Sequence, residues 1–293
     1  MRTAALPLLA AAAFLAPATP ASEWPLQLSA RAAWAENHSR TSDPNTAKDA
    51  AAHEVAASTG VTRQLASGWL ASADGVVAWE QVPKFDALDA WRFALQGDLR
   101  RKFGLGPLAP TLQVGASVQR SKFEEDGRSG TQLQAGVRLG KRLTPSWRAA
   151  AGGEWTRYYA RHAPFDLHQQ RVYVETAWDL TERWQLSAGA ARIEGEITAN
   201  AAGPVYMAAL AGGFGPAIQS YYRSIPWHVT GTFGPGWIAY RVDAEADLWW
   251  AGISPALGER TSLPLRYERA DVVNRVGVRY VSEFWSLALM HRF

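Results

Sequence analysis

The segment Trp237-Ile-Ala-Tyr-Arg-Val-Asp-Ala-Glu-Ala-Asp-Leu-Trp-Trp250 alternates between apolar and polar residues with a period of two. Its even positions, from Ile238 onward, are apolar, whereas the odd positions from Arg241 to Asp247 are charged. Successive side chains of a β-strand point to opposite faces of the sheet. The segment is therefore predicted to be a strand with one apolar and one polar face.

The same alternation recurs along the chain, and all of the secondary structure it predicts is β. It is clear at 111–119, 132–140 and 168–180, and further strands are predicted at 184–197, 263–280 and 284–293. These segments run to about 10–15 residues, longer than the usual strand of a soluble protein and long enough to cross a bilayer at a tilt.

The placement of aromatic residues favours a membrane barrel over a soluble sandwich. The chain has 14 tryptophans in 293 residues, and tryptophan and tyrosine are enriched at membrane–water interfaces. Trp147 and Trp155 lie on one face, about 26 Å apart along a strand and roughly 20 Å apart in membrane depth after tilt, close to the ~25 Å apolar band of such barrels. The predicted fold is an all-β, transmembrane, antiparallel up-and-down β-barrel.

Composition excludes several other classes of protein. The chain has 30 Lys and Arg residues against 27 Asp and Glu residues, a net charge of +3 that is too small to indicate a nucleic-acid partner. It has no cysteine, which excludes a disulfide scaffold, thiolate metal sites and a cysteine nucleophile. No cofactor and no metal site are expected.

The first 21 residues have the layout of a secretory signal peptide. Arg2 supplies a positive charge, 4–15 is an almost unbroken apolar run, and small residues precede candidate cleavage sites after Ala18 and Ala21. We expect cleavage after Ala21 and a single barrel domain over 22–293, folded outside the cytoplasm.

Turn signals divide the predicted barrel into hairpins. Short turns are predicted at 72–75, 103–110, 144–146 and 181–183, and longer polar connections at 37–54, 82–87, 123–130 and 161–167. Two of the short turns lie in a repeat, Leu143-Thr-x-x-Trp147 and Leu180-Thr-x-x-Trp184. Short turns at one end and longer loops at the other are typical of outer-membrane barrels, with the short turns on the periplasmic side.

The number of strands depends on 198–236. If this Gly- and Pro-rich stretch is one long loop the barrel has 12 strands, and if it contains a further hairpin the barrel has 14. We favour 12. The motif Val281-Ser-x-x-Trp285 resembles the periplasmic turns, although the strand count places it at the opposite end.

Side-chain alternation assigns residues to the lumen and to the membrane interface. The lumen is predicted to be lined by charged side chains, namely Arg138, Glu154, Arg171, Glu175, Asp179, Arg241, Asp243, Glu245, Asp247, Arg275 and Arg279. The predicted interface anchors are Trp147, Trp155, Trp178, Trp184, Trp250 and Trp285. The lumen charges fit two readings: a network of ion pairs that fills a narrow interior, or a pore lining that selects solutes.

The C-terminal strand ends with Leu287, Leu289, His291 and Phe293 on one face. This pattern resembles the C-terminal assembly signal of Gram-negative outer-membrane β-barrel proteins, in which Leu287, Leu289 and Phe293 match and His291 departs. The resemblance implies location in the bacterial outer membrane, contact with outer-membrane lipids including lipopolysaccharide, and recognition by the barrel assembly machinery. It identifies no subfamily and leaves the oligomeric state open.

No catalytic constellation stands out, so an enzyme is not expected. Barrels of this size include outer-membrane phospholipases, but the one His-Ser pair, His38-Ser39, lies in a polar loop without strand alternation. His162, Asp166 and His168 could gather a metal, although a polar loop is the better reading. The favoured function is a passive channel, a porin or an export conduit, for polar solutes. The alternatives are a non-conducting structural or surface-recognition barrel and a lipid-modifying enzyme.

Overall fold

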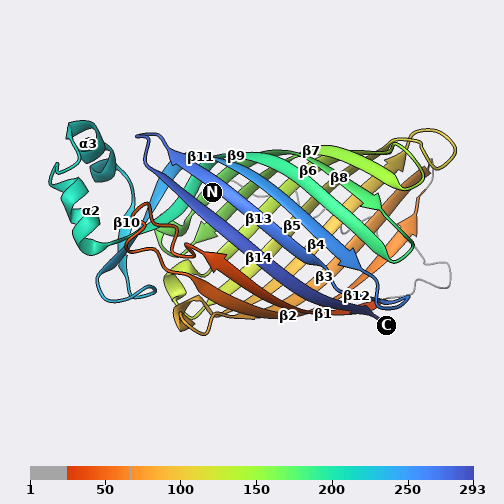
Figure 1. The fold of residues 1–293 in the computed structure, drawn as a ribbon, viewed down its shortest axis with the longest axis horizontal. Coiled ribbons are helices and arrows are strands. Elements are labelled where there is room, and N and C mark those ends of the chain that lie inside the picture. The colour runs from red at the N-terminus through yellow and green to blue at the C-terminus, as the bar shows by residue number, and fades with distance from the viewer. Residues whose placement is uncertain (1–24, 66–67) are drawn as a thin grey trace, which may run out of the picture.

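The computed structural model describes residues 25–65 and 68–293, which form a closed antiparallel β-barrel (Figure 1). Twelve long strands make the wall: β1 (Leu26–Glu36), β2 (Ala50–Gln64), β3 (Trp69–Gln81), β4 (Ala90–Lys102), β5 (Thr111–Phe123), β6 (Gly130–Arg142), β7 (Trp147–Ala160), β8 (Leu167–Asp179), β9 (Trp184–Ala202), β11 (Trp237–Pro255), β13 (Leu265–Asn274) and β14 (Arg279–Arg292). Each strand pairs with the next one in this order, and β14 pairs with β1 to close the barrel.

Two short strands lie outside this wall. β10 (Trp227–Thr230) pairs with the first four residues of β11, and β12 (Thr261–Ser262) pairs with β14 beside the last turn. The prediction of an all-β barrel with 12 strands is therefore confirmed, and the alternative of 14 strands is wrong.

The strands are strongly tilted, as the pairing register shows. A row of cross-strand partners that starts at Gln64, the last residue of β2, ends at Ser282, near the first residue of β14. The row passes through Leu70, Arg100, Gln113, Arg138, Gly152, Tyr173, Ala191, Leu248 and Ala270. Because it crosses from one rim to the other, the strands incline to the barrel axis as closure requires.

The two rims differ in their longest connections, although 103–110 has eight residues whereas 124–129 and 161–166 at the other rim have six. Short connections at 103–110, 143–146 and 180–183 lie at the end that holds the C-terminus, on the right in Figure 1. The loops at 82–89, 124–129 and 161–166 lie at the opposite end, together with the longer loop 37–49. We call these the short-turn end and the loop end.

Two predicted boundaries are wrong. Residues 72–75 lie inside β3, because Asp74 and its neighbours pair with β2 and β4 on both sides. The predicted strand 263–280 is two strands, β13 and β14, joined by a turn at 275–278 in which Gly277 has a φ of +81°. The Val281–Trp285 motif therefore lies within β14, which removes its conflict with the strand count.

The long predicted loop is shorter and more ordered than expected. β9 continues to Ala202, so the connection to β11 is 203–236, which we call the cap segment. It holds α2 (Gly203–Leu210), α3 (Pro216–Ser224) and β10, which project from the loop end at the left of Figure 1. Among the described residues no helix is long and apolar enough to cross a membrane. The predicted signal peptide lies outside the described residues.

Candidate functional site

Exposure along each strand separates the outer from the inner face of the wall. On β8, Val172 and Val174 are 62% and 58% exposed and belong to the outer face. The alternate residues Arg171, Tyr173 and Glu175 consequently point into the barrel. By the same register the structure places five predicted lumen residues on the inner face: Arg138, Glu154, Arg171, Glu175 and Asp179.

In the structure, the charged face of β11 points outward and not into the lumen as predicted. Asp247 pairs with Arg192, which pairs with the lipid-facing Val172, so Asp247 lies on the outer face. The side chains of Glu245 and Asp247 are 56% and 70% exposed, and Asp243 and Arg241 lie on the same face. The predicted lumen positions Arg241, Asp243, Glu245 and Asp247 are therefore corrected to the outer face.

Ion pairs and an apolar interior explain this inversion. Arg192 pairs with Glu245, with Asp247 at 3.2 Å and with Glu194 at 3.5 Å on the outer surface. On the inner face, Ala244 and Ala246 are buried in an apolar cluster that also contains Tyr206 and Tyr222 of the cap segment. The apolar face of β11 therefore points into the barrel, and at the loop end its Tyr240 packs against Tyr206 of α2 and Tyr222 of α3.

The predicted lumen residues Arg275 and Arg279 also lie outside. Arg275 occupies the turn after β13, where its side chain is 72% exposed and lies 3.3 Å from Asp243. Arg279 pairs with Val273, which pairs with the outward Glu245, so it belongs to the outer face.

The predicted tryptophan anchors divide into two groups. Five of them lie on the outer face with 37–51% exposure: Trp147, Trp155, Trp178, Trp184 and Trp285. Trp250 is 5% exposed and points into the barrel, where it lies between the guanidinium groups of Arg171 and Arg266. Its assignment as an anchor is corrected.

The exposed residues of the last strand lie on the outer face at the closing seam. Leu287 and Leu289 are 43% and 44% exposed and pair with Ala32 and Ala30 of β1, while Phe293 is 58% exposed at the short-turn end. Recognition of these residues by an assembly machinery stays a prediction.

Several of the charges inside the barrel form ion pairs. Arg138 lies 2.8 Å from Glu175, and Arg171 lies 3.1 Å from Glu154. Nearer the short-turn end, Arg148 and Asp179 are 3.2 Å apart, and Arg266 and Glu268 are 2.6 Å apart. Such pairing is what partly buried charges require.

A second interior group was missed by the sequence reasoning. Arg92 contacts Glu54 at 2.9 Å and Glu80 at 2.7 Å, and Arg31 contacts the same two carboxylates at 3.2 Å and 3.6 Å. Glu54 was placed in a loop and the other three were not assigned to strands. The segment 50–58 contains one carboxylate, Glu54, and its five alanines hide the alternation that would mark a strand.

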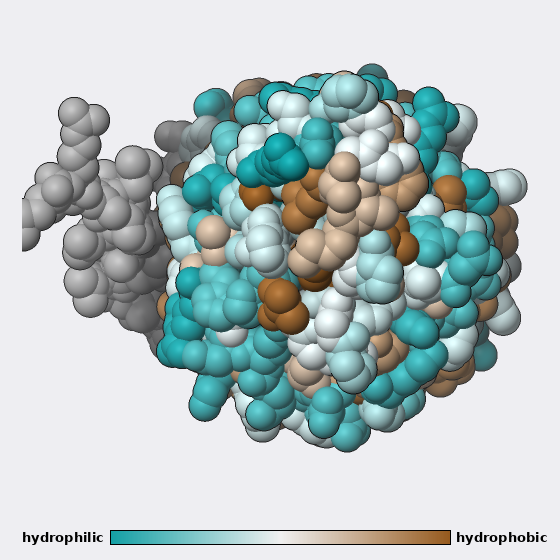
Figure 2. All heavy atoms as spheres, turned by 90° about the vertical axis from the view of Figure 1, so that its left-hand side faces the viewer, coloured by the Kyte–Doolittle hydropathy of each residue, from teal (hydrophilic) through white to brown (hydrophobic). Residues whose placement is uncertain are grey.

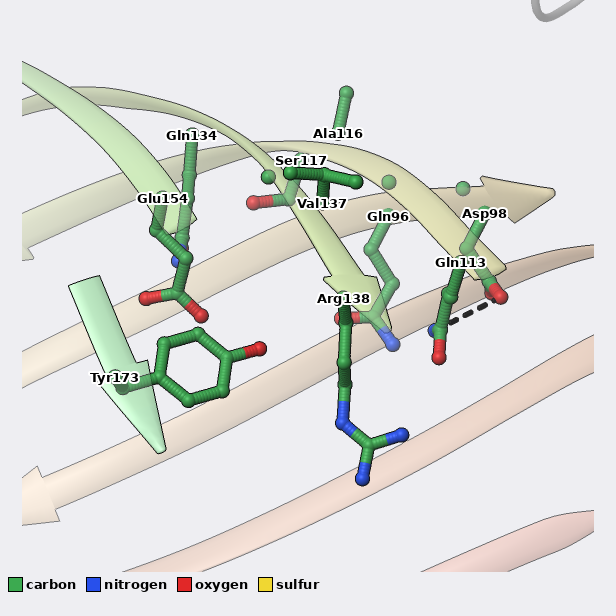
Figure 3. A pocket seen from close by; sticks show the side chains of 13 residues that line it. Gln96, Asp98, Gln113, Ala116, Ser117, Gln134, Val137, Arg138, Glu154 and Tyr173 are labelled. Carbon is green, nitrogen blue, oxygen red and sulfur yellow. Dashed lines mark hydrogen bonds between the residues drawn. The ribbon is translucent and has the colours of Figure 1, made fainter. Parts of the chain in front are cut away.

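A cavity of about 260 Å³ lies in the inner wall between β4 and β8. Its polar lining consists of Gln96, Asp98, Gln113, Ser117, Gln134, Arg138, Glu154 and Tyr173. Figure 3 shows these side chains projecting from neighbouring strands around a common space, with Gln113 bonded to Asp98. A further hollow of about 410 Å³ opens at the short-turn end and is lined in part by Arg148, Asp179 and Trp184.

The loop end is closed by the cap segment. Glu125 accepts hydrogen bonds from Thr230 at 2.6 Å and from Thr232, and it pairs with Arg128 at 2.6 Å. The buried Arg128 guanidinium stacks over Phe165 at 4.2 Å. Burial opposes ionisation of Glu125, but the Arg128 charge and the hydrogen bonds outweigh it and lower the pKa of its carboxyl.

Aromatic packing continues the closure across the mouth. Phe233 lies 5.0 Å from Phe85 of the loop after β3 and 5.4 Å from Trp237, and the three belong to one buried apolar cluster. His38 packs edge-on against Phe233. Figure 2 shows this end of the molecule filled by side chains, with hydrophobic atoms near its centre.

Burial is the main reason that the pKa of His38 falls from 6.5 to about 4, and Arg40 and Arg128 lower it further against the opposing effect of Glu80. The closed mouth thus holds His38 as the neutral ring. A buried bond from Asn200 to the carbonyl of Ser39, 2.8 Å long, ties the loop after β1 to β9.

The other candidates for chemistry do not assemble. Ser39 is fully buried and its hydroxyl donates to Asn37, while His38 faces Phe233. His162 packs on His228, whereas His168 accepts a hydrogen bond from Trp155. Within 25–65 and 68–293 no group of three or more His, Cys, Asp or Glu residues is arranged to hold a metal.

Comparison with known proteins identifies the fold. No protein-family profile matches the chain, and no curated protein matches it either. An outer-membrane channel from Pseudomonas putida F1 shares the structure with a TM-score of 0.61 at 10% identity, over 94% of this chain and 97% of that one. The NanC porin has a TM-score of 0.47 at 9% identity, over 91% of this chain and 100% of that one. The DcaP channel of Acinetobacter baumannii has a TM-score of 0.43 at 9% identity, over 95% of this chain and 99% of that one. The chain thus has the fold of an outer-membrane channel barrel.

Proposed function

We propose that this protein is a channel for small polar solutes in the bacterial outer membrane, and that the cap segment closes its loop end in the state described here. The observation that carries the proposal is a membrane-facing exterior around a polar, incompletely filled interior. Large apolar residues such as Val55, Leu95 and Val172 are 57–65% exposed on the outside, where a soluble protein would not leave them. Side chains can fill the interior of an eight-stranded barrel, and a barrel of twelve strands has a wider interior.

The orientation of the barrel follows from its rims. Short turns and both chain ends lie on the periplasmic side of such barrels. The loop end, with the cap segment, would then face the cell exterior, and the open hollow lined by Arg148 and Asp179 would face the periplasm. Lipopolysaccharide would surround the outer half of the wall, and the exposed face of the last strand would be read by the assembly machinery.

The mouth is closed by the conformation of the cap segment, and the strands of the wall need not move for it to open. The wall supplies Phe85 through a loop, whereas Phe233, Thr230 and Thr232 come from a 34-residue connection between two strands. Connecting segments move on faster timescales than the paired strands that carry them. Release of the cap segment would expose the polar interior to the outside.

Single-channel recording in planar bilayers tests the proposal. We expect rare conductance steps from the wild-type protein and at least tenfold more frequent opening after Phe233→Ala, which removes the ring packed against Phe85. Leu105→Ala is the matched control, because Leu105 is fully exposed in a turn at the other end. Heat-modifiable gel migration verifies that each variant is folded, and a folded Phe233→Ala protein without steps would reject the channel.

The closed mouth itself favours one other candidate, a non-conducting barrel that presents the cap segment as a recognition surface. The two functions differ in the same recording. A non-conducting barrel would stay silent after the mouth is opened, since nothing in its role requires a continuous path through the wall.

A further inference from the structure

We propose that the cavity between β4 and β8 is a binding site for an uncharged, polyhydroxylated solute of about one sugar ring in size. This inference rests on the proposed channel function and names the class of solute that the interior would take. It comes from the chemistry of the side chains that are left free around the cavity.

The charged groups at the cavity are already engaged. Arg138 is held by Glu175 at 2.8 Å, and Glu154 by Arg171 at 3.1 Å, so each charge is compensated by a neighbour. A charged solute would have to break one of these pairs and leave a partly buried partner without its counter-ion, which costs more than a new pair returns.

Among the described residues Asp98 has no cationic partner, and each of its oxygens accepts one hydrogen bond. Oδ1 accepts a hydrogen bond from the amide of Gln113 at 3.0 Å, and Oδ2 accepts one from the hydroxyl of Ser72. The carboxylate is therefore oriented within the wall by two neutral donors, and its remaining lone pairs can accept hydrogen bonds from the hydroxyls of a solute.

The free hydrogen-bonding groups are neutral. Among the described residues, the side chains of Gln96, Gln134 and Ser117 form no hydrogen bond with protein, and the Tyr173 hydroxyl forms none either. Each amide both donates and accepts, as does each hydroxyl. A sugar hydroxyl likewise donates and accepts, so this set matches a neutral polyol better than an ion.

Glycines give the cavity its depth. Gly115 and Gly136 are cross-strand partners that face inward, so two adjacent positions of the wall carry no side chain. A Cβ on Gly136 would come within 3.1 Å of Cγ of Glu154 and would narrow the hollow. The missing side chains leave a recess in which a small ring can lie against the backbone.

An aromatic face lies at one side of this recess. Tyr173 lies over Gly152, its cross-strand partner. A side chain at Gly152 would overlap the tyrosine ring, so glycine is needed there. An apolar surface beside a few placed polar groups is the usual composition of small-molecule sites. The volume of about 260 Å³ is near the lower limit of such sites and suits one ring, not a chain of rings.

Saturation-transfer NMR on the purified wild-type protein in detergent tests the proposal with three pyranose probes of similar size: glucose, glucuronate and glucosamine. We expect saturable transfer to glucose, and affinity at least tenfold weaker for the anionic and cationic probes. Gln134→Leu and, separately, Gln96→Leu should each weaken glucose binding at least threefold. Gln170→Leu, on the exposed outer face of β8, is the matched control and should leave it unchanged.

Absence of saturable glucose transfer to the folded protein would overturn the proposal, as would glucuronate or glucosamine binding as tightly as glucose. Equal effects of Gln134→Leu and Gln170→Leu would overturn the location. The test is independent of conductance: a protein that binds glucose but never conducts would refute the channel and keep the site.

Discussion

Trp250 on β11 lies flat over Gly189 on β9, its cross-strand partner, inside the barrel. A Cβ at position 189 would overlap the six-membered ring of the indole, so glycine is required for the strands to keep this pairing. The ring is held from the sides by Arg171 and Arg266, whose guanidinium carbons lie 5.4 Å and 5.0 Å from it. One tryptophan thus organises the interior between β8 and β13.

Substitution of this glycine tests the contact. Gly189→Val should destabilise the barrel by about 1–3 kcal/mol, because the indole must leave a fully packed position. Urea unfolding followed by tryptophan fluorescence in lipid vesicles measures the change. Gly258→Val is the control, since a Cβ there meets no atom within 4 Å, and equal losses in the two variants would contradict the packing role.

The four-charge cluster near the loop end should behave as a coupled unit. Arg92→Ala leaves the partly buried Glu54 and Glu80 with only Arg31 and should lower the free energy of unfolding by about 2 kcal/mol. Adding Glu80→Ala should restore part of the loss, because the excess negative charge is removed. A double variant that is as unstable as the sum of the two single variants would show that the groups are independent.

Charges on the outer face should not govern ion selectivity. The triple change Asp243→Asn, Glu245→Gln and Asp247→Asn removes three carboxylates that point away from the lumen. The triple change is made in the Phe233→Ala variant, in which the channel is expected to open. The reversal potential in a salt gradient should equal that of Phe233→Ala alone. Asp98→Asn, inside the barrel, should shift it, and the opposite pattern would contradict the assignment of the two faces.

Acidification should loosen the closed mouth through His38. Because burial and two arginines hold its pKa at about 4, compared with 6.5 for the ordinary group, the undocked loop binds the proton more readily than the closed one. Closure is then fully stable above pH 6.5 and loses stability as the pH falls from about 6.5 to about 4. Opening frequency in planar bilayers should rise across this range.

The variant His38→Phe keeps a ring against Phe233 and has no proton to gain. Its opening frequency should be flat over the same range, where the lowered pKa of Glu125 keeps that carboxyl ionised for most of the titration. An unchanged rise in the variant would assign the pH response to another group.

The sequence predicts strands and closure well because both depend on local periodicity. Alternation at 168–180 and 237–250 marks β8 and β11, and their polar faces were read from the same rule. The rule gives the correct face for Arg171 and Glu175 but inverts Glu245 and Asp247, because it assumes that apolar residues face lipid. On β11 the apolar side chains instead meet Tyr206 and Tyr222, whose position depends on contacts distant in sequence.

The closed mouth could not be predicted for the same reason. Glu125, Thr230 and Phe85 lie in three different connections with no pattern of their own, and they meet only once the barrel brings their strand ends together. The interior ion pairs could be predicted in part. The sequence predicts that Arg138 and Glu175 face the lumen, but their pairing depends on the register of β6, β7 and β8.

The central claim, that the lumen conducts and the cap segment closes it, is tested most directly by locking and releasing the mouth in one molecule. The chain has no cysteine, so Phe85→Cys with Phe233→Cys introduces a single thiol pair where two rings now pack 5.0 Å apart. The reduced variant should conduct, conductance should vanish when a short bifunctional methanethiosulfonate joins the thiols, and a reductant should restore it. Conductance that is the same in the joined and reduced states of the folded protein would contradict the account.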